Sequence, residues 1–290
     1  MFSGSIVALV TPFSQGKVDE NALQDLVSWQ IAQGTQGIVT CGSTGEGALL
    51  TKSERDRVIS LVIEVAHKRV PVIVGCGAPS TQEVVQMAQD AKRLGADAIL
   101  IVTPYYVKPS QEGLYQHFLN VHNSTDLPII AYNNPGRANV EISIDLFLRL
   151  TELPNIVALK DSTNDISRPA LMCSRLSKPF NLLCGDDPYT SAYLGQGGDG
   201  CISITANVAP KLCKELMDAW KNNDRANFNL LTQRLIPLHL SMVAEVNPCP
   251  IKYAVSALGK IKNELRLPYL PVTSITEEKV RSAMKAVGIL

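Results

Sequence analysis

The chain has 290 residues with 27 basic and 27 acidic side chains, so its formal net charge is zero. Apolar residues make up 46% of it and charged residues 19%, a balance that supplies a large core and excludes an intrinsically disordered chain. Zero net charge argues against sequence-independent binding of nucleic acid, and without an apolar run of about 20 residues or a signal-peptide pattern we expect a cytoplasmic protein that does not enter a membrane.

Short apolar runs of strand length alternate with longer amphipathic segments along most of the chain. Because the runs are apolar throughout, they indicate strands that are covered by helices on both faces. In chain order the predicted strands are residues 5–11, 37–41, 71–76, 97–103, 127–132, 155–160, 180–185 and 199–204.

Amphipathic helices are predicted in the gaps, several of them ended by a glycine such as Gly34 or Gly95. Their ranges are 20–33, 53–67, 82–94, 111–122, 144–150, 166–176, 189–194 and 210–222. Eight strand–helix units predict an α/β fold, a (β/α)8 TIM barrel over residues 1–223, with residues 224–290 as a C-terminal helical bundle packed on it. A doubly wound open sheet is the alternative, but its Gly-rich first turn is missing.

Cysteine and histidine spacing gives no sign of a metal site. The seven cysteines are scattered without a C-x-x-C pair, and the four histidines lack the spacing of zinc ligands. We expect reduced thiols that pack in the core, and no bound metal.

In a barrel of this kind the chemistry lies at the C-terminal ends of the strands. Lys160 ends the sixth predicted strand, and strand alternation puts Ile156, Ala158 and Lys160 on one face. Apolar surroundings disfavour an ammonium ion and leave an amine free to attack a carbonyl group. The residues alone leave two alternatives open, a Schiff-base lysine or a structural lysine paired with Glu46 or Asp186.

Neighbouring strand ends carry further candidates. Tyr132 ends the fifth strand, where its phenol either moves protons or closes the core. Residues 42–45, Gly-Ser-Thr-Gly, offer amides and hydroxyl groups to a carboxylate, or form only a tight turn. Arg137, in a Pro-Gly loop, binds a second carboxylate or remains a solvated charge. The pair Tyr105-Tyr106 is more typical of packing than of chemistry.

Motifs along the whole chain connect these candidates. In order they are GSIVALVTPF, GSTGE, VTPYYVKPSQEGLYQHF, LPIIAYNNPGR, ALKDST, GDD, ISITANVAP and NPCPIK. With them the sequence resembles the family of pyruvate-dependent class I aldolases that contains the N-acetylneuraminate lyases and the 4-hydroxy-tetrahydrodipicolinate (dihydrodipicolinate) synthases. The GSTGE form occurs in both branches, whereas Arg137 and Tyr105-Tyr106 favour the synthase branch.

The resemblance implies a lysine Schiff-base mechanism that needs no metal or organic cofactor. Lys160 would bind pyruvate, and the resulting enamine would condense with L-aspartate 4-semialdehyde to give 4-hydroxy-tetrahydrodipicolinate, a step of lysine and diaminopimelate biosynthesis. Tyr132 would act as general acid and base in a hydroxyl relay with Ser43 and Tyr106, and Tyr106 would come from a neighbouring subunit of a homotetramer, a dimer of dimers. The other implied contacts are Thr44 with the amide of Ser43 for the pyruvate carboxylate, Gly185 and the carbonyl of Ile202 as pocket lining, and Arg137 for the carboxylate of the semialdehyde.

Many synthases bind lysine between subunits, near the loops that follow the second and third strands. The resemblance assigns this possible effector region to Lys52, Arg55, Pro79 and Glu83. Two cations and a proline are poor surroundings for a ligand that carries its own ammonium group. We therefore predict that feedback inhibition by lysine is weak or absent.

Two other functions stay open at this point. A sister aldolase or lyase would use pyruvate with a sugar-derived aldehyde, as the N-acetylneuraminate lyases do, and would differ in the aldehyde that Arg137 and its loop select. A barrel that has lost catalysis would serve as a binding or regulatory protein. The joint presence of Lys160, Tyr132, Ser43 and Tyr106 argues against the second of these.

Overall fold

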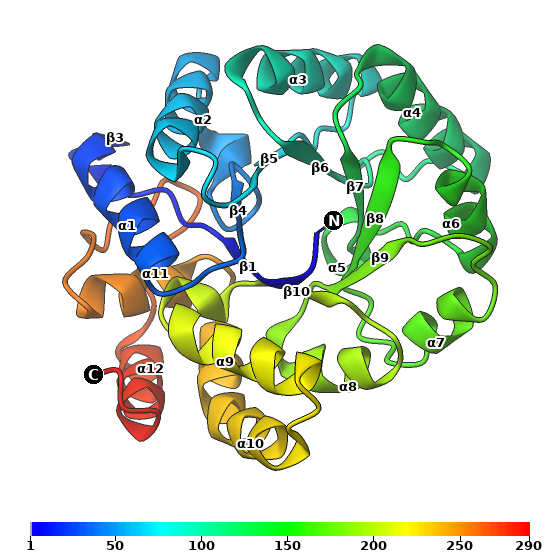
Figure 1. The fold of residues 1–290 in the computed structure, drawn as a ribbon. Coiled ribbons are helices and arrows are strands. Elements are labelled where there is room, and N and C mark those ends of the chain that lie inside the picture. Colours follow the sequence, from blue (N-terminus) through cyan, green and yellow to red (C-terminus); the bar gives the residue numbers. More distant parts are fainter. Residues whose placement is uncertain (1) are drawn as a thin grey trace.

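A computed structural model describes residues 2–290. Eight parallel strands close into a barrel in the order β1-β10-β9-β8-β7-β6-β5-β4, with helices around it (Figure 1). The strands are β1 (Gly4–Ala8), β4 (Gly37–Thr40), β5 (Val72–Gly75), β6 (Ala98–Val102), β7 (Ile129–Asn133), β8 (Ile156–Asp161), β9 (Asn181–Cys184) and β10 (Gly200–Ser203). The prediction of a TIM barrel with a helical C-terminal extension is confirmed.

The helices follow the predicted alternation and differ from it only at their ends. Around the barrel lie α1 (Glu20–Ala32), α2 (Lys52–Ala66), α3 (Thr81–Leu94), α4 (Gln111–Ser124), α6 (Ile144–Thr151), α7 (Arg168–Cys173), α8 (Thr190–Gly195) and α9 (Pro210–Lys221). The C-terminal helices are α10 (Arg225–Met242), α11 (Cys249–Ala257) and α12 (Ser274–Ala286). Short elements that the sequence did not predict are the hairpin β2 (Phe13–Ser14) and β3 (Lys17–Val18) and the one-turn helix α5 (Pro135–Ala138).

Helix α2 begins before the predicted Ser53, because Thr51 caps it. The Thr51 hydroxyl accepts a hydrogen bond from the Glu54 amide, and the Glu54 carboxylate accepts one from the Thr51 amide. This reciprocal pair satisfies two amides that the first turn leaves without helical partners.

Strand β8 is irregular, and this corrects one prediction. Ile129 pairs with Ile156 but Ile130 pairs with Ala158, so Val157 is an extra residue in β8. Ile156 therefore packs in the outer core, whereas Ala158 faces the barrel interior. The expectation that Ile156 shares a face with Ala158 and Lys160 is wrong, because one inserted residue reverses the alternation.

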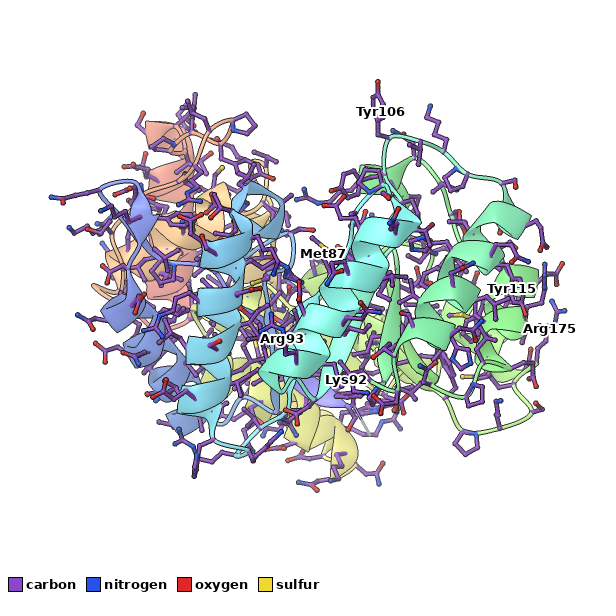
Figure 2. The ribbon with its side chains drawn as sticks, turned by 90° about the horizontal axis from the view of Figure 1, so that it is seen from above. Met87, Lys92, Arg93, Tyr106, Tyr115 and Arg175 are labelled. Atoms are coloured by element: carbon purple, nitrogen blue, oxygen red, sulfur yellow. The ribbon has the colours of Figure 1, made fainter. Side chains whose placement is uncertain are left out.

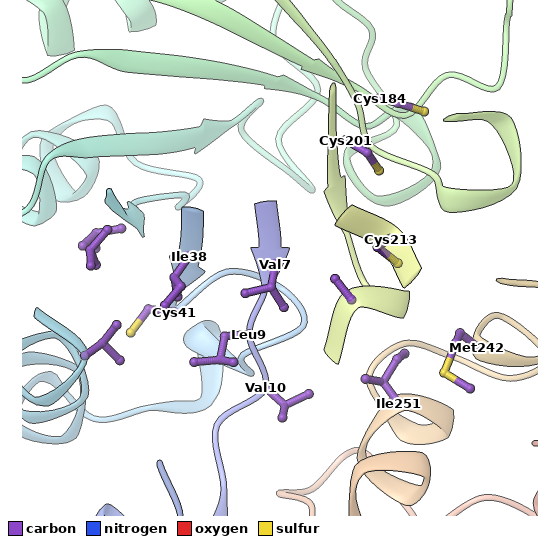
Figure 3. Packing of buried hydrophobic residues seen from close by; sticks show 14 of the residues in the cluster. Val7, Leu9, Val10, Ile38, Cys41, Cys184, Cys201, Cys213, Met242 and Ile251 are labelled. Carbon is purple, nitrogen blue, oxygen red and sulfur yellow. The ribbon is translucent and has the colours of Figure 1, made fainter. Parts of the chain in front are cut away.

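Two apolar cores hold the fold together. The barrel interior is filled mainly by aliphatic side chains, among them Ile6, Val39, Ile73 and Leu183. The larger core lies between the strands and the surrounding helices, and Figure 3 shows part of it. Burial of these apolar side chains is the main force that closes the barrel.

The C-terminal helices continue this larger core. Leu9 and Val10 of the barrel belong to the same cluster as Met242 and Ile251, on the side of α1 and α9 (Figures 1 and 3). The strand–helix alternation ends with α9, and the division into domains at residues 223 and 224 stays a prediction. Within residues 2–290, no helix is both long and apolar enough to cross a membrane.

Candidate active site

A cavity of about 560 Å³ opens at the C-terminal ends of the strands. Strand ends β4, β7, β8 and β9 bring their polar residues there, although these residues are far apart in the sequence. Six of the eight predicted catalytic and substrate-binding residues line the cavity, namely Ser43, Thr44, Tyr132, Arg137, Lys160 and Gly185, and Arg55 of the predicted effector region lines it as well. The barrel geometry therefore gathers most of the predicted site in one place.

Lys160 and Tyr132 are direct neighbours across strands β8 and β7. Lys160 Nζ lies 4.1 Å from the centre of the Tyr132 ring, and both side chains are buried. The Tyr132 hydroxyl accepts a hydrogen bond of 2.6 Å from the Asn134 side chain. This arrangement places an amine beside a phenol within an otherwise apolar barrel.

Within the described residues, Lys160 forms no ion pair, although two carboxylates line the same cavity. Glu46 is paired with Lys252 instead, with 2.6 Å between Oε1 and Nζ. The alternative in which Glu46 neutralises Lys160 is therefore wrong. Burial raises the pKa of Asp186, and the positive charge of Lys160 opposes that shift.

Gly185 leaves room for the lysine. A Cβ atom at this position would stand 3.0 Å from Lys160 Cε and would collide with the Ser162 hydroxyl. A larger residue would have to displace the Ser162 side chain and press against Lys160, so glycine fits best. Its predicted place in the pocket thus has a steric reason.

The loop after β4 is tightly folded. Cys41 and Glu46 have positive φ angles of 54° and 53°. The Glu46 amide donates to the Ser43 carbonyl, and the Thr11 hydroxyl donates to the Gly45 carbonyl at 2.7 Å. These bonds hold Ser43 and Thr44 at the mouth of the cavity, where amide and hydroxyl groups suit a carboxylate.

Asn247 joins two of the predicted substrate contacts. Its Nδ2 donates to Thr44 Oγ1 at 3.1 Å, and its carbonyl oxygen accepts from Arg137 Nη2 at 3.0 Å. Sequence reasoning assigned no role to this residue, although the motif NPCPIK contains it. The motif was a usable signal, since it places an amide side chain in a segment otherwise rich in proline and apolar residues.

Two predicted residues lie outside the cavity of this chain. Tyr106 is 88% exposed with φ at 73°, and Figure 2 shows it pointing away from the rest of the molecule. Ile202 is buried in the barrel interior, and the cavity lining includes Ile204 in its place. The contact through the Ile202 carbonyl and the contribution of Tyr106 to a neighbouring subunit stay predictions.

Comparison with known proteins identifies the family. The model of the dihydrodipicolinate synthetase family matches residues 1–287. The chain belongs to this family. The 4-hydroxy-tetrahydrodipicolinate synthase of Rhodospirillum centenum is 49% identical over 290 residues, and the match covers both chains completely.

Solved structures agree with this. The dihydrodipicolinate synthase of Acinetobacter baumannii, solved in complex with pyruvate, has a TM-score of 0.97 and 43% identity over the full length of both chains. A dihydrodipicolinate synthase variant described as monomeric has a TM-score of 0.98 and 37% identity, covering 100% of this chain and 98% of the variant.

The predicted effector region forms a second, smaller cavity of about 250 Å³ beside the first. Lys52, Arg55 and Glu83 line it, but Pro79 does not. Arg55 is buried and donates to the Gly75 carbonyl at 2.9 Å. A cavity with a fixed guanidinium group in its wall repels a second cation unless acidic groups outweigh it.

Lys52 is already paired within the protein. Its Nζ lies 2.8 Å from a carboxylate oxygen of Asp56 and 2.9 Å from one of Asp90. Asp56 and Asp90 are thus partly neutralised by Lys52, whereas Glu83, the third carboxylate in the wall of this cavity, forms no ion pair within residues 2–290. For residues 2–290, no three His, Cys, Asp or Glu side chains come together in a way that would hold a metal ion.

Proposed function

We propose that this member of the dihydrodipicolinate synthetase family condenses pyruvate with L-aspartate 4-semialdehyde through a Schiff base on Lys160. The product is 4-hydroxy-tetrahydrodipicolinate, in the biosynthesis of lysine and diaminopimelate. The family match and full-length relatives with this activity support the reaction. The structural observation that carries the assignment of Lys160 is its position beside Tyr132 in the cavity, without a carboxylate partner.

The chemistry follows from an amine in this position. The Lys160 amine attacks the keto carbon of pyruvate, and loss of water gives an iminium ion. The iminium nitrogen accepts electrons, so the pyruvate methyl group loses a proton and an enamine forms. The enamine carbon attacks the aldehyde. The amino group of the semialdehyde then attacks the iminium carbon, closes the ring and releases Lys160.

The other cavity residues transfer protons or bind the carboxylates of the two substrates. Tyr132 gives and takes the protons of carbinolamine formation and dehydration, with Ser43 as the next hydroxyl of the relay. Thr44 and the Ser43 amide hold the pyruvate carboxylate, and Arg137 receives the carboxylate of the semialdehyde. Neither a sugar-aldehyde lyase nor a non-catalytic barrel is favoured, because the full-length relatives carry the synthase name.

We further propose a homotetramer in which Tyr106 completes the relay of a neighbouring subunit. An exposed tyrosine with a left-handed backbone, followed by the exposed Val107, is costly on a free surface and is explained by a partner. Analytical ultracentrifugation tests the assembly. A fully active monomer would contradict the role of Tyr106. The free cysteines fit a reducing compartment, and we place the reaction in the cytoplasm.

The decisive experiment measures pyruvate consumption with and without L-aspartate 4-semialdehyde. We expect consumption that requires the semialdehyde, and its fall by roughly 10³-fold or more in Lys160→Ala. Borohydride reduction with pyruvate should add a covalent group to the wild-type protein and none to Lys160→Ala. Lys68→Ala is the control, because Lys68 is exposed and pairs only with Asp97. Consumption with N-acetylmannosamine instead of the semialdehyde would overturn the proposal.

A further inference from the structure

A fully buried ion pair lies beside the candidate active site and has no task in the proposed mechanism. Lys252 Nζ of α11 is 2.6 Å from Glu46 Oε1, in the loop after β4, and neither side chain has exposed surface. The two residues are 206 positions apart in the chain. The pair is thus a direct link between the C-terminal helices and the loop that carries Ser43 and Thr44.

The surroundings complete the hydrogen bonding of this pair. Glu46 Oε2 accepts a bond of 3.0 Å from the Arg266 amide, and Lys252 Nζ lies 4.1 Å from the centre of the buried Phe13 ring. Buried ion pairs are weak stabilisers, because the cost of removing both charges from water offsets their attraction. Stability alone is therefore a poor explanation for placing two charges here.

The local geometry indicates what the pair holds. Glu46 lines the catalytic cavity, has a positive φ and ends the turn that its amide closes onto the Ser43 carbonyl. The next residue, Gly47, has no space for a Cβ atom because the Cys41 carbonyl occupies it. Among the contacts to this tight loop, the ion pair of Glu46 with Lys252 is the one between two charged side chains without exposed surface.

We propose that Lys252 is a positioning residue for substrate binding: its ion pair with Glu46 fixes residues 42–46 in the shape that receives the pyruvate carboxylate. The pair also keeps the Glu46 carboxylate away from Lys160. This inference rests on the proposed function, since it concerns the same cavity and the same first substrate.

Three variants test this role. Lys252→Met keeps the length of the side chain and removes its charge, Glu46→Gln keeps the shape of the acid, and the double variant makes the site neutral. We expect Lys252→Met to raise the KM for pyruvate by about ten-fold, with a smaller change in kcat and in the KM for the semialdehyde. Lys68→Met is the matched control, because it breaks an exposed pair at the opposite end of the barrel.

The double variant separates positioning from stability. It has no unpaired buried charge, so we expect its thermal midpoint to return toward that of the wild type while its KM for pyruvate stays raised. Recovery of both quantities together would overturn the proposal and assign the pair a structural role only. An unchanged KM in folded Lys252→Met would overturn it as well.

Borohydride trapping at increasing pyruvate concentration gives a readout that needs no second substrate. The variants should reach half-maximal labelling at higher pyruvate concentration than the wild type. If the wild type itself is not labelled, the proposed Schiff-base function fails. If the wild type is labelled and the variants show the same pyruvate dependence, only the role of Lys252 fails.

Discussion

The barrel and the C-terminal helices contribute to one cavity in different ways. The barrel strands supply the groups that we propose to react, with Lys160 and Tyr132 side by side at the ends of β8 and β7. The C-terminal segment supplies none of the groups that we propose to react, but Asn247 bonds to Thr44 and Arg137, and Lys252 pairs with Glu46.

This difference has a physical cause. A residue on a strand is positioned by hydrogen bonds to both neighbouring strands. A loop beyond the strand end lacks these hydrogen bonds and is anchored only where it joins the strand. Tight placement of a loop therefore requires contacts from another part of the chain. The C-terminal segment provides such contacts through Asn247 and Lys252, so it contributes to the candidate active site although it lies outside the barrel.

Tyr132→Phe tests the reacting side of this comparison and should give the largest effect. Phenylalanine keeps the ring beside Lys160 Nζ but removes the proton donor. We expect kcat to fall by about 10²–10⁴-fold with little change in thermal midpoint. The matched control is Tyr253→Phe, which removes a buried hydroxyl bonded to Arg281 in the C-terminal helices. Equal kcat in the two variants would make Tyr132 a packing residue.

Asn247→Ala tests the supporting side. The substitution removes the hydrogen bond to Thr44 and loosens the segment whose carbonyl binds Arg137. The KM values for both substrates should therefore rise, and the product of the two increases should be about ten-fold. Steady-state kinetics with each substrate varied in turn provides the measurement. Asn120→Ala serves as control, because Asn120 bonds only to the Gln116 carbonyl on the exposed face of α4. A lower kcat with unchanged KM values would contradict a supporting role.

Glu54→Gln tests a contact between the two regions, the ion pair of Glu54 in α2 with Arg266 in the C-terminal segment. The Arg266 guanidinium lowers the pKa of Glu54 from 4.5 to about 2. Since the folded pKa lies below the unfolded one, the pair stabilises the protein above pH 4.5 and loses this effect as the pH falls toward 2. Glutamine keeps the helix cap but not the charge.

We expect Glu54→Gln to lower the free energy of unfolding by about 1–2 kcal/mol at neutral pH, less than the full pKa shift implies, because the pair is partly exposed. Urea unfolding between neutral and acid pH measures the difference between variant and wild type. This difference should shrink as the pH falls below 4.5. A difference that stays constant over this range would show that charge is not its cause.

Added lysine should have the smallest effect. The wall of the second cavity contains two cations, Lys52 and the buried Arg55, and Lys52 pairs with two of the three acids there, Asp56 and Asp90. We expect millimolar lysine to leave the rate of the purified enzyme nearly unchanged. Half-inhibition at low-micromolar lysine would contradict this and would make the barrel wall a regulatory site.

Particular elements show which features of the structure could be predicted from the sequence. Uniform apolar runs predicted all eight strands, because strands buried on both faces need no polar alternation. The same rule misplaced Ile156, since the extra residue Val157 is visible only when β7 and β8 are paired. The resemblance implied that Tyr106 points away from its own chain, but no local pattern did, because the direction depends on a backbone angle in the loop after β6.

The sequence by itself determined the barrel, the ring of polar strand ends and the lysine and tyrosine that meet there, because each follows from a local pattern repeated along the chain. Only the tertiary structure decided which partner each charged or amide side chain takes. Glu46 faces Lys252 and not Lys160, and Asn247 reaches Thr44 across 203 positions of sequence. Such pairs depend on how distant segments pack when the barrel and the C-terminal helices come together. Periodicity in the sequence reports only local structure, so it does not predict which distant side chains meet.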